Sequence, residues 1–119
     1  MNRRQILLAS LFSVLPSALY AQAFTPKQDG TIAVSASTSN TNGTLSAPPT
    51  SSAPSQFRVF NACAVTAFIR FGGSATTSNL PVPSGAVEVL SAPAGTTTVG
   101  VILASGSGCS VYFTTGAGL

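Results

Sequence analysis

Hydrophobic and polar residues alternate along most of the second half of the chain. From Val65 to Phe71, apolar residues occupy the odd-numbered positions, and Thr66, Phe68 and Arg70 lie between them. The same period of two recurs in residues 87–89, 99–103 and 111–114. Turns rich in glycine, proline or asparagine separate the runs, at residues 61–62, 72–73, 81–85, 93–95 and 106–108. Because this period is typical of strands, the sequence predicts an all-β fold, a small antiparallel β-sandwich or barrel of about six to eight short strands.

The N-terminal segment, residues 1–23, differs from the rest because it has the three parts of an export signal. A positive region at Arg3 and Arg4 precedes an apolar run over residues 6–15, and residues 21–23 read Ala-Gln-Ala. The apolar run is short for a membrane span. We therefore expect a hydrophobic signal that is cleaved after Ala23. The alternative is an uncleaved anchor or arm, and only in that case do we expect contact with a membrane.

The remaining chain divides by composition into two parts. Residues 24–55 contain a stretch rich in serine, threonine, asparagine and proline, which buries little apolar surface and is typical of linkers and exposed loops. We expect one or two short strands there, one of them around residues 43–47. Residues 56–119 carry the alternating pattern and form the predicted β-sandwich core.

Charged residues make up only 6% of the chain, which argues against electrostatic binding to nucleic acid. Beyond residue 23 the charged residues are three basic and two acidic ones: Lys27, Arg58, Arg70, Asp29 and Glu88. They form no basic stripe along the sequence, so we expect no nucleic-acid partner.

The residue types of most active sites are absent or isolated. Histidine is missing, and Asp29 and Glu88 have no second acid near them in the sequence. A nucleophilic serine requires a base, and two thiols with scattered carboxylates make a poor metal site. We therefore expect no enzymatic activity and no catalytic, cofactor-binding or metal-binding residue.

The two cysteines, Cys63 and Cys109, lie next to predicted strands. In a small exported β-domain, such a pair is typical of a disulfide. The bond would close a loop of nearly fifty residues, which the chain-entropy account values at about 4 kcal/mol. Two buried free thiols are the alternative.

A mixed aromatic and arginine face is the strongest candidate for an interaction site. If the strands are regular, Phe60 shares a face with Arg58, and Phe68 shares one with Arg70. The two arginines would form a cationic spot if their strands were neighbours, or one would pair with Glu88 across the sheet. The alternative is an ordinary solvated face. The candidate interface comprises Arg58, Phe60, Phe68, Arg70 and Tyr112.

Four segments resemble a known group of proteins: "RVFNA", "AFIRFG", "PVPSGAVEVL" and the terminal "VYFTTGAGL". Over about residues 56–119 the chain resembles small β-sandwich structural proteins of tailed bacteriophages, which serve as capsid decoration or minor structural subunits. The shared motifs are structural, so the resemblance implies no catalytic or binding residue.

This resemblance implies a virion location and packing against a capsid or other virion protein, together with homo-oligomer formation. The alternative is a secreted or periplasmic bacterial β-sandwich binding module, which the signal-like N-terminus and the paired cysteines favour.

Overall fold

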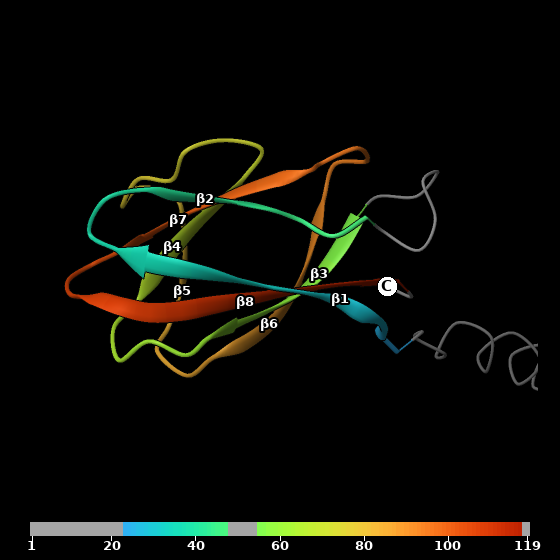
Figure 1. The fold of residues 1–119 in the computed structure, drawn as a ribbon, viewed down its shortest axis with the longest axis horizontal. Helices are drawn as coiled ribbons and strands as arrows, with labels where there is room; N and C mark the ends of the chain where they lie inside the picture. Colours follow the sequence, from blue (N-terminus) through green and yellow to red (C-terminus); the bar gives the residue numbers. More distant parts are fainter. Residues whose placement is uncertain (1–22, 48–54, 118–119) are drawn as a thin grey trace, which may run out of the picture.

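The structure is a computed structural model that describes residues 23–47 and 55–117 (Figure 1). Eight strands lie in these ranges: β1 (Thr25–Ser37), β2 (Thr41–Thr44), β3 (Ser55–Asn61), β4 (Ala67–Phe71), β5 (Leu80–Val82), β6 (Val87–Ala92), β7 (Thr98–Leu103) and β8 (Ser107–Ala117). The described ranges contain no helix, and so none that is long and apolar enough to cross a membrane. The predicted all-β fold is confirmed. The predicted signal segment lies outside the described residues, apart from Ala23.

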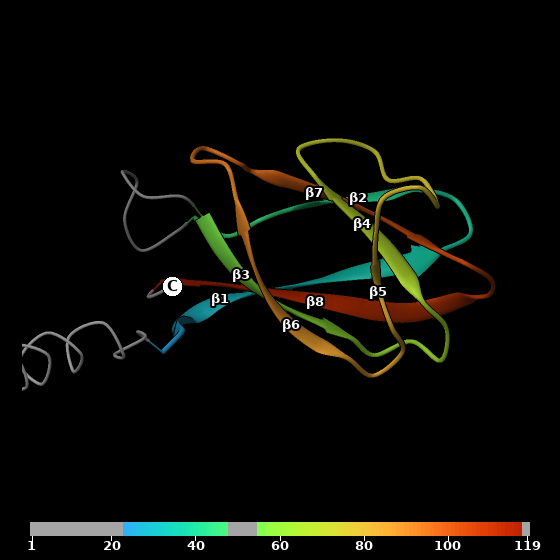
Figure 2. The same ribbon diagram turned by 180° about the vertical axis from the view of Figure 1, so that it is seen from behind.

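The strands form two antiparallel sheets of four strands each, an arrangement compatible with a β-sandwich (Figure 2). Sheet A has the order β1-β8-β3-β6, and sheet B has the order β2-β7-β4-β5. Among the eight strands, β4 and β5 are the one consecutive pair that shares a sheet. Every other connection between described strands therefore passes from one sheet to the other.

The first strand is longer than the sequence predicted. β1 has 13 residues, and its second half alternates regularly, with Val34 and Ala36 buried and the residues on either side more exposed. Together, β1 and β2 give one strand to each sheet, so the folded unit includes the residues from Thr25 to Thr44 that form them. Of the one or two short strands predicted for that segment, β2 is short, whereas β1 is long.

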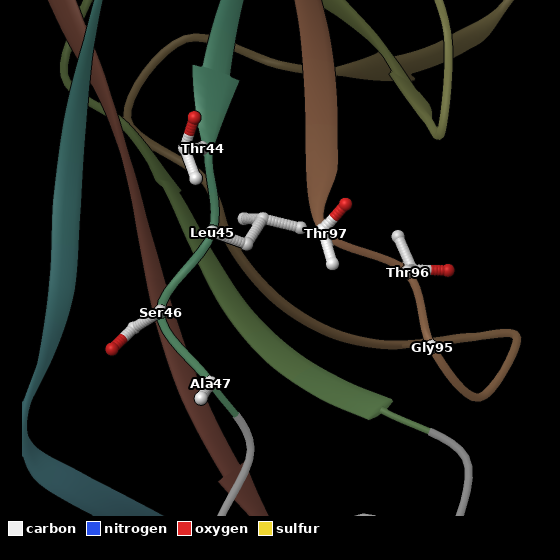
Figure 3. Close-up of a pocket in the computed structure, with 7 residues that line it drawn as sticks. All are labelled: Thr44, Leu45, Ser46, Ala47, Gly95, Thr96 and Thr97. Carbon is white, nitrogen blue, oxygen red and sulfur yellow. The ribbon is translucent and has the colours of Figure 1, made fainter.

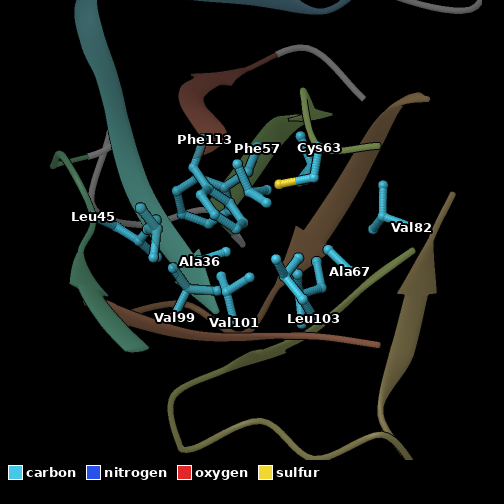
Figure 4. Packing of buried hydrophobic residues seen from close by; sticks show 14 of the residues in the cluster. Ala36, Leu45, Phe57, Cys63, Ala67, Val82, Val99, Val101, Leu103 and Phe113 are labelled. Carbon is cyan, nitrogen blue, oxygen red and sulfur yellow. The ribbon is translucent and has the colours of Figure 1, made fainter. Parts of the chain in front are cut away.

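Side chains from both sheets fill the space between them (Figure 4). The ring of Phe57 is stacked on that of Phe71 with 5.2 Å between centroids, and Phe71 meets Phe113 edge-on at 6.2 Å. The larger aliphatic side chains of the buried cluster are Val34, Leu45, Val59, Ile69, Val82, Val99, Val101, Leu103 and Val111. Because each buried aliphatic side chain of this size contributes about 1.5–3 kcal/mol, this layer is the main source of stability.

The predicted disulfide between Cys63 and Cys109 is present, with 5.3 Å between the two Cα atoms. The bond continues the ladder between β3 and β8. Asn61 lies opposite Val111, and the Ala62 amide donates to the Ser110 carbonyl at 3.2 Å. The cysteines are the next pair in the same register. The disulfide therefore fastens two neighbouring strands of sheet A at the point where β3 ends.

Candidate interaction surface

One row of apolar side chains crosses the outer face of sheet A, the face that points away from sheet B. The strand register places Ala33 of β1 opposite Tyr112 of β8, Tyr112 opposite Phe60 of β3, and Phe60 opposite Val87 of β6. The rings of Phe60 and Tyr112 are stacked, with 6.0 Å between centroids and 17° between ring planes. The row therefore includes one residue from each of the four strands.

The solvent exposure of this row is high for apolar side chains. Val87 is 47% exposed, Tyr112 36%, and Val89, two residues along β6, 36%. These three are among only four large hydrophobic side chains that are exposed in the described ranges. We call the set of Ala33, Phe60, Val87, Val89 and Tyr112, together with Arg58, the outer patch.

Local sequence explains why apolar side chains reach this face. In β6 the order Val-Glu-Val-Leu puts Val87 and Val89 on the outer face, while Leu90 packs against the core. In β3, Phe57 and Val59 are fully buried and Phe60 points the other way. Successive residues of a strand face opposite sides. Since apolar residues occupy neighbouring positions in β3 and β6, both faces of sheet A carry apolar side chains. The sequence analysis did not place Val87 and Val89 in the interface, although the adjacent apolar pairs Ala86–Val87 and Val89–Leu90 indicate apolar side chains on both faces of this strand.

Arg58 is the one charged residue that the described strand pairings place on this face. It lies opposite Thr114 and Val89, in the row next to Phe60 and Tyr112. Glu88 lies opposite Val59, whose side chain is buried, so Glu88 and Arg58 are on opposite faces. The cross-strand pair of Arg58 with Glu88, one alternative from the sequence, is therefore wrong.

The five residues of the predicted interface separate into two groups. Arg58, Phe60 and Tyr112 lie together on the outer face of sheet A. Phe68 and Arg70 belong to β4 of sheet B, where Phe68 lies opposite Ile102 and Arg70 opposite Gly100. The predicted cationic spot of two neighbouring arginines is therefore wrong, because β3 and β4 are consecutive in sequence but belong to different sheets.

Phe24 covers one end of the outer face of sheet A. Gly116 of β8 lies opposite Gln56 of β3 in the row beyond Arg58. A Cβ atom on Gly116 would collide with the ring of Phe24, so this ring lies directly on the glycine. Gln56 is only 7% exposed although it shares the outer face. The residue just before β1 thus closes this end of the sheet, a role that the sequence did not indicate.

A small pocket lies at the end of β2 (Figure 3). Its volume is about 250 Å³, and the Leu45 amide donates to the Thr97 carbonyl at 2.8 Å beside it. The lining consists of Thr44, Leu45, Ser46, Ala47, Gly95, Thr96 and Thr97. These side chains are hydroxyls and small apolar groups, and none of them titrates near neutral pH. The lining side chains therefore offer neither a general base nor an acid, and the titratable side chain that contacts the lining is Lys27, whose Nζ donates to the Ala47 carbonyl at 3.1 Å.

Metal-binding groups do not gather in residues 23–47 and 55–117. No group of three or more histidine, cysteine, aspartate or glutamate side chains there is placed to hold an ion. Both cysteines are bonded to each other and are not available as thiolate ligands. The outer patch is therefore the best candidate site that the described residues contain.

No family model matches the chain, and no curated protein or solved structure is significantly similar to it. The resemblance to phage structural proteins therefore stays a prediction.

Proposed function

We propose that this chain is a non-enzymatic structural protein that acts by packing the outer patch against another protein. The observation that carries the proposal is the apolar row on sheet A, in which Phe60 and Tyr112 are stacked beside the exposed Val87. Contiguous exposed apolar residues with aromatic members are typical of protein–protein contact surfaces. A single cation at the side of the row, Arg58, gives such a contact a preferred orientation.

We further propose a phage virion as the setting, with the chain as a capsid decoration or minor structural subunit. The support is the resemblance of residues 56–119 to such proteins, together with the all-β fold of the described residues, which the resemblance implies. On a shell with many equivalent sites, contacts of modest affinity add up when each subunit touches several neighbours.

The test compares two matched lysine substitutions. Tyr112→Lys places an ammonium group in the outer patch, and Phe68→Lys places one on the outer face of sheet B. Both proteins are mixed with purified particles of the phage that encodes the chain, and co-sedimentation is measured. We expect wild type and Phe68→Lys to sediment at a fixed copy number per particle, and Tyr112→Lys to stay in the supernatant. Equal binding by all three would refute the outer patch as the contact surface.

A secreted or periplasmic binding module is the second candidate, because a disulfide is favoured in an oxidising compartment. The two settings differ in the mature N-terminus and in the location of the protein. Cells that express the full chain are fractionated, and the intact mass of the protein is measured. A protein that begins at Phe24 and is recovered as a soluble species from the periplasm would replace the virion proposal with this one.

A further inference from the structure

We propose that β6 pairs with β6 of a second copy, so that two sheets A join into one continuous eight-stranded sheet. This inference deepens the proposed function, since it rests on the chain acting by protein packing. It concerns the backbone edge of β6, whose Val87 and Val89 also belong to the outer patch, whereas particle binding is tested at Tyr112 on β8, so the two proposals can fail separately.

Of the four edge strands, β6 has the fewest features that hinder pairing with another strand. β5 has three residues and contains Pro81, which has no amide to donate. β2 has only four residues. β1 pairs regularly over Thr31 to Ala36, but an irregularity in register lies at each end of that run. β6 pairs with β3 over six consecutive residues without a bulge and contains no proline. Short strands, prolines and bulges protect edges, and β6 has none of these three between Val87 and Ala92. Its one protective feature of another kind is the charge of Glu88 on the inner face, which the register proposed below keeps apart from the Glu88 of the second copy.

Some backbone amides and carbonyls of β6 point toward its free edge, where a further strand could pair with them. The Asn61 amide donates to the Ala86 carbonyl at 3.1 Å, and the Asn61 carbonyl accepts from the Gly85 amide at 2.8 Å, so both backbone groups of Asn61 point toward this strand. In an antiparallel ladder hydrogen-bonded pairs alternate with pairs that are not hydrogen-bonded. The amides and carbonyls of Val87, Val89 and Ser91 therefore point away from β3. The same three residues place their side chains on the outer face.

A two-fold axis at Val89 gives each of these amides and carbonyls a hydrogen-bond partner on the second copy. Val89 then lies opposite Val89 of the second copy, and Val87 lies opposite Ser91 of the second copy. These pairs supply about six inter-strand hydrogen bonds. Glu88 lies opposite Leu90 of the second copy, so the two carboxylates are apart. The outer side chains stay outer and the inner ones stay inner on both copies, as a continuous sheet requires.

The two neighbouring registers are less favourable than the register centred on Val89. A shift of the axis to Glu88 places two carboxylates directly opposite each other, which is destabilising. A shift to Leu90 places Val87 opposite Pro93, which cannot donate a hydrogen bond. The register centred on Val89 therefore has the best combination of hydrogen bonds and charge separation.

The first experiment measures the molar mass of the full chain by light scattering over a range of concentrations. We expect wild type to reach twice the mass of one chain. Val89→Lys puts two ammonium groups at the axis and raises the dissociation constant by at least roughly tenfold. Tyr112→Lys, a control on β8, leaves the dimer intact. A wild-type protein that stays monomeric up to about 1 mM overturns the proposal. Its binding free energy would then be weaker than about 4 kcal/mol. Dissociation by Tyr112→Lys but not by Val89→Lys also overturns it.

The second experiment tests the register with cysteines introduced one at a time. Val89→Cys places two thiols opposite each other, at a Cα separation of about 5.5 Å that suits a disulfide. We expect oxidation to give a covalent dimer that reduction returns to monomer. Val87→Cys is the matched control on the same face, and its thiols lie four residues apart along the paired strands. Cross-linking at residue 87 and not at residue 89 overturns the register. A dimer that forms as described, with no loss of particle binding in Tyr112→Lys, removes only the proposed function of the outer patch.

Discussion

The side-chain amide of Asn61 donates a hydrogen bond to the backbone carbonyl of Val82, with 2.9 Å between nitrogen and oxygen. Asn61 ends β3 in sheet A, and Val82 ends β5 in sheet B, so this bond joins the two sheets. The same amide also donates to the Val65 carbonyl at 2.9 Å, and its oxygen accepts from the Cys63 amide at 2.9 Å. The side chain is fully buried. Since unpaired buried polar groups are costly, all three partners depend on this asparagine.

We predict that Asn61→Asp destabilises the fold by about 2–4 kcal/mol at neutral pH. A carboxylate cannot donate to the carbonyls of Val65 and Val82, and it is buried without a cation. Burial raises its pKa in the folded state, so the folded protein binds the proton more tightly than the unfolded chain. The loss of stability therefore grows as pH rises through the folded-state pKa. Chemical denaturation at several pH values measures it.

Asn79→Asp is the matched control for this prediction. The Asn79 side-chain oxygen accepts from the Thr76 amide at 2.7 Å in an exposed turn, a bond that a carboxylate preserves. We expect a change within about 0.5 kcal/mol. An equal loss in both variants would show that the buried amide has no special role.

Removal of the disulfide should lower the free energy of unfolding by about 3–4 kcal/mol. The bond joins residues 46 positions apart, and breaking it restores conformational freedom mainly to the unfolded chain. The measurement compares denaturation of wild type with and without a reductant. The double variant Cys63→Ala, Cys109→Ala serves as the control and should show no response to the reductant. Wild type that is unfolded without reduction should contain no free thiol, and two reactive thiols would contradict the assignment.

Gly43→Ala should destabilise the contact between β1 and β2 by about 1–3 kcal/mol. A Cβ atom at Gly43 would lie 2.6 Å from Cγ2 of Val34, a core residue, and 3.1 Å from Cδ1 of Ile32. The neighbouring Thr44→Ala, on an exposed side chain, is the control. If the collision is the cause, Val34→Ala should relieve part of the cost of Gly43→Ala, which a double-mutant cycle of denaturation energies detects. Strict additivity would contradict this explanation.

The alternating pattern located four strands well, because it reports directly on which side chains are buried. The predicted runs at residues 65–71, 87–89, 99–103 and 111–114 correspond to β4, β6, β7 and β8. The length of β1 escaped prediction, since its alanine, serine and threonine residues are as common in loops as on the outer face of a sheet. Its apolar positions are few, and only the contacts with β8 and β2 make them informative.

The position of the candidate site depended on topology, which periodicity does not contain. Arg58 and Arg70 occur at equivalent places in successive strands, yet those strands belong to different sheets. The grouping of Phe60 with Tyr112 requires β3 and β8 to be neighbours, although they are distant in sequence. The disulfide was predictable because a pair of cysteines in such a chain leaves one intramolecular pairing.

The contact of Phe24 with Gly116 leads to the last prediction, that residue 24 contributes to stability although it precedes the first strand. Its ring lies on Gly116 at the end of the outer face where Gln56 is buried. Phe24→Ala should lower the free energy of unfolding by about 1–2 kcal/mol, because it exposes this end of the sheet to water. Thr25→Ala, on the neighbouring exposed residue, should change it by less than about 0.5 kcal/mol.

A double-mutant cycle separates this contact from a general effect of the N-terminus. Gly116→Ala fills the place that the ring occupies and should displace it, so it should cost less in the Phe24→Ala background than in wild type. Equal costs in both backgrounds would mean that the ring does not rest on Gly116. The contact also bears on processing, since cleavage after Ala23 keeps Phe24 in the mature chain. Cleavage one residue later would remove the ring, and the mature protein should then be less stable by the same amount as Phe24→Ala.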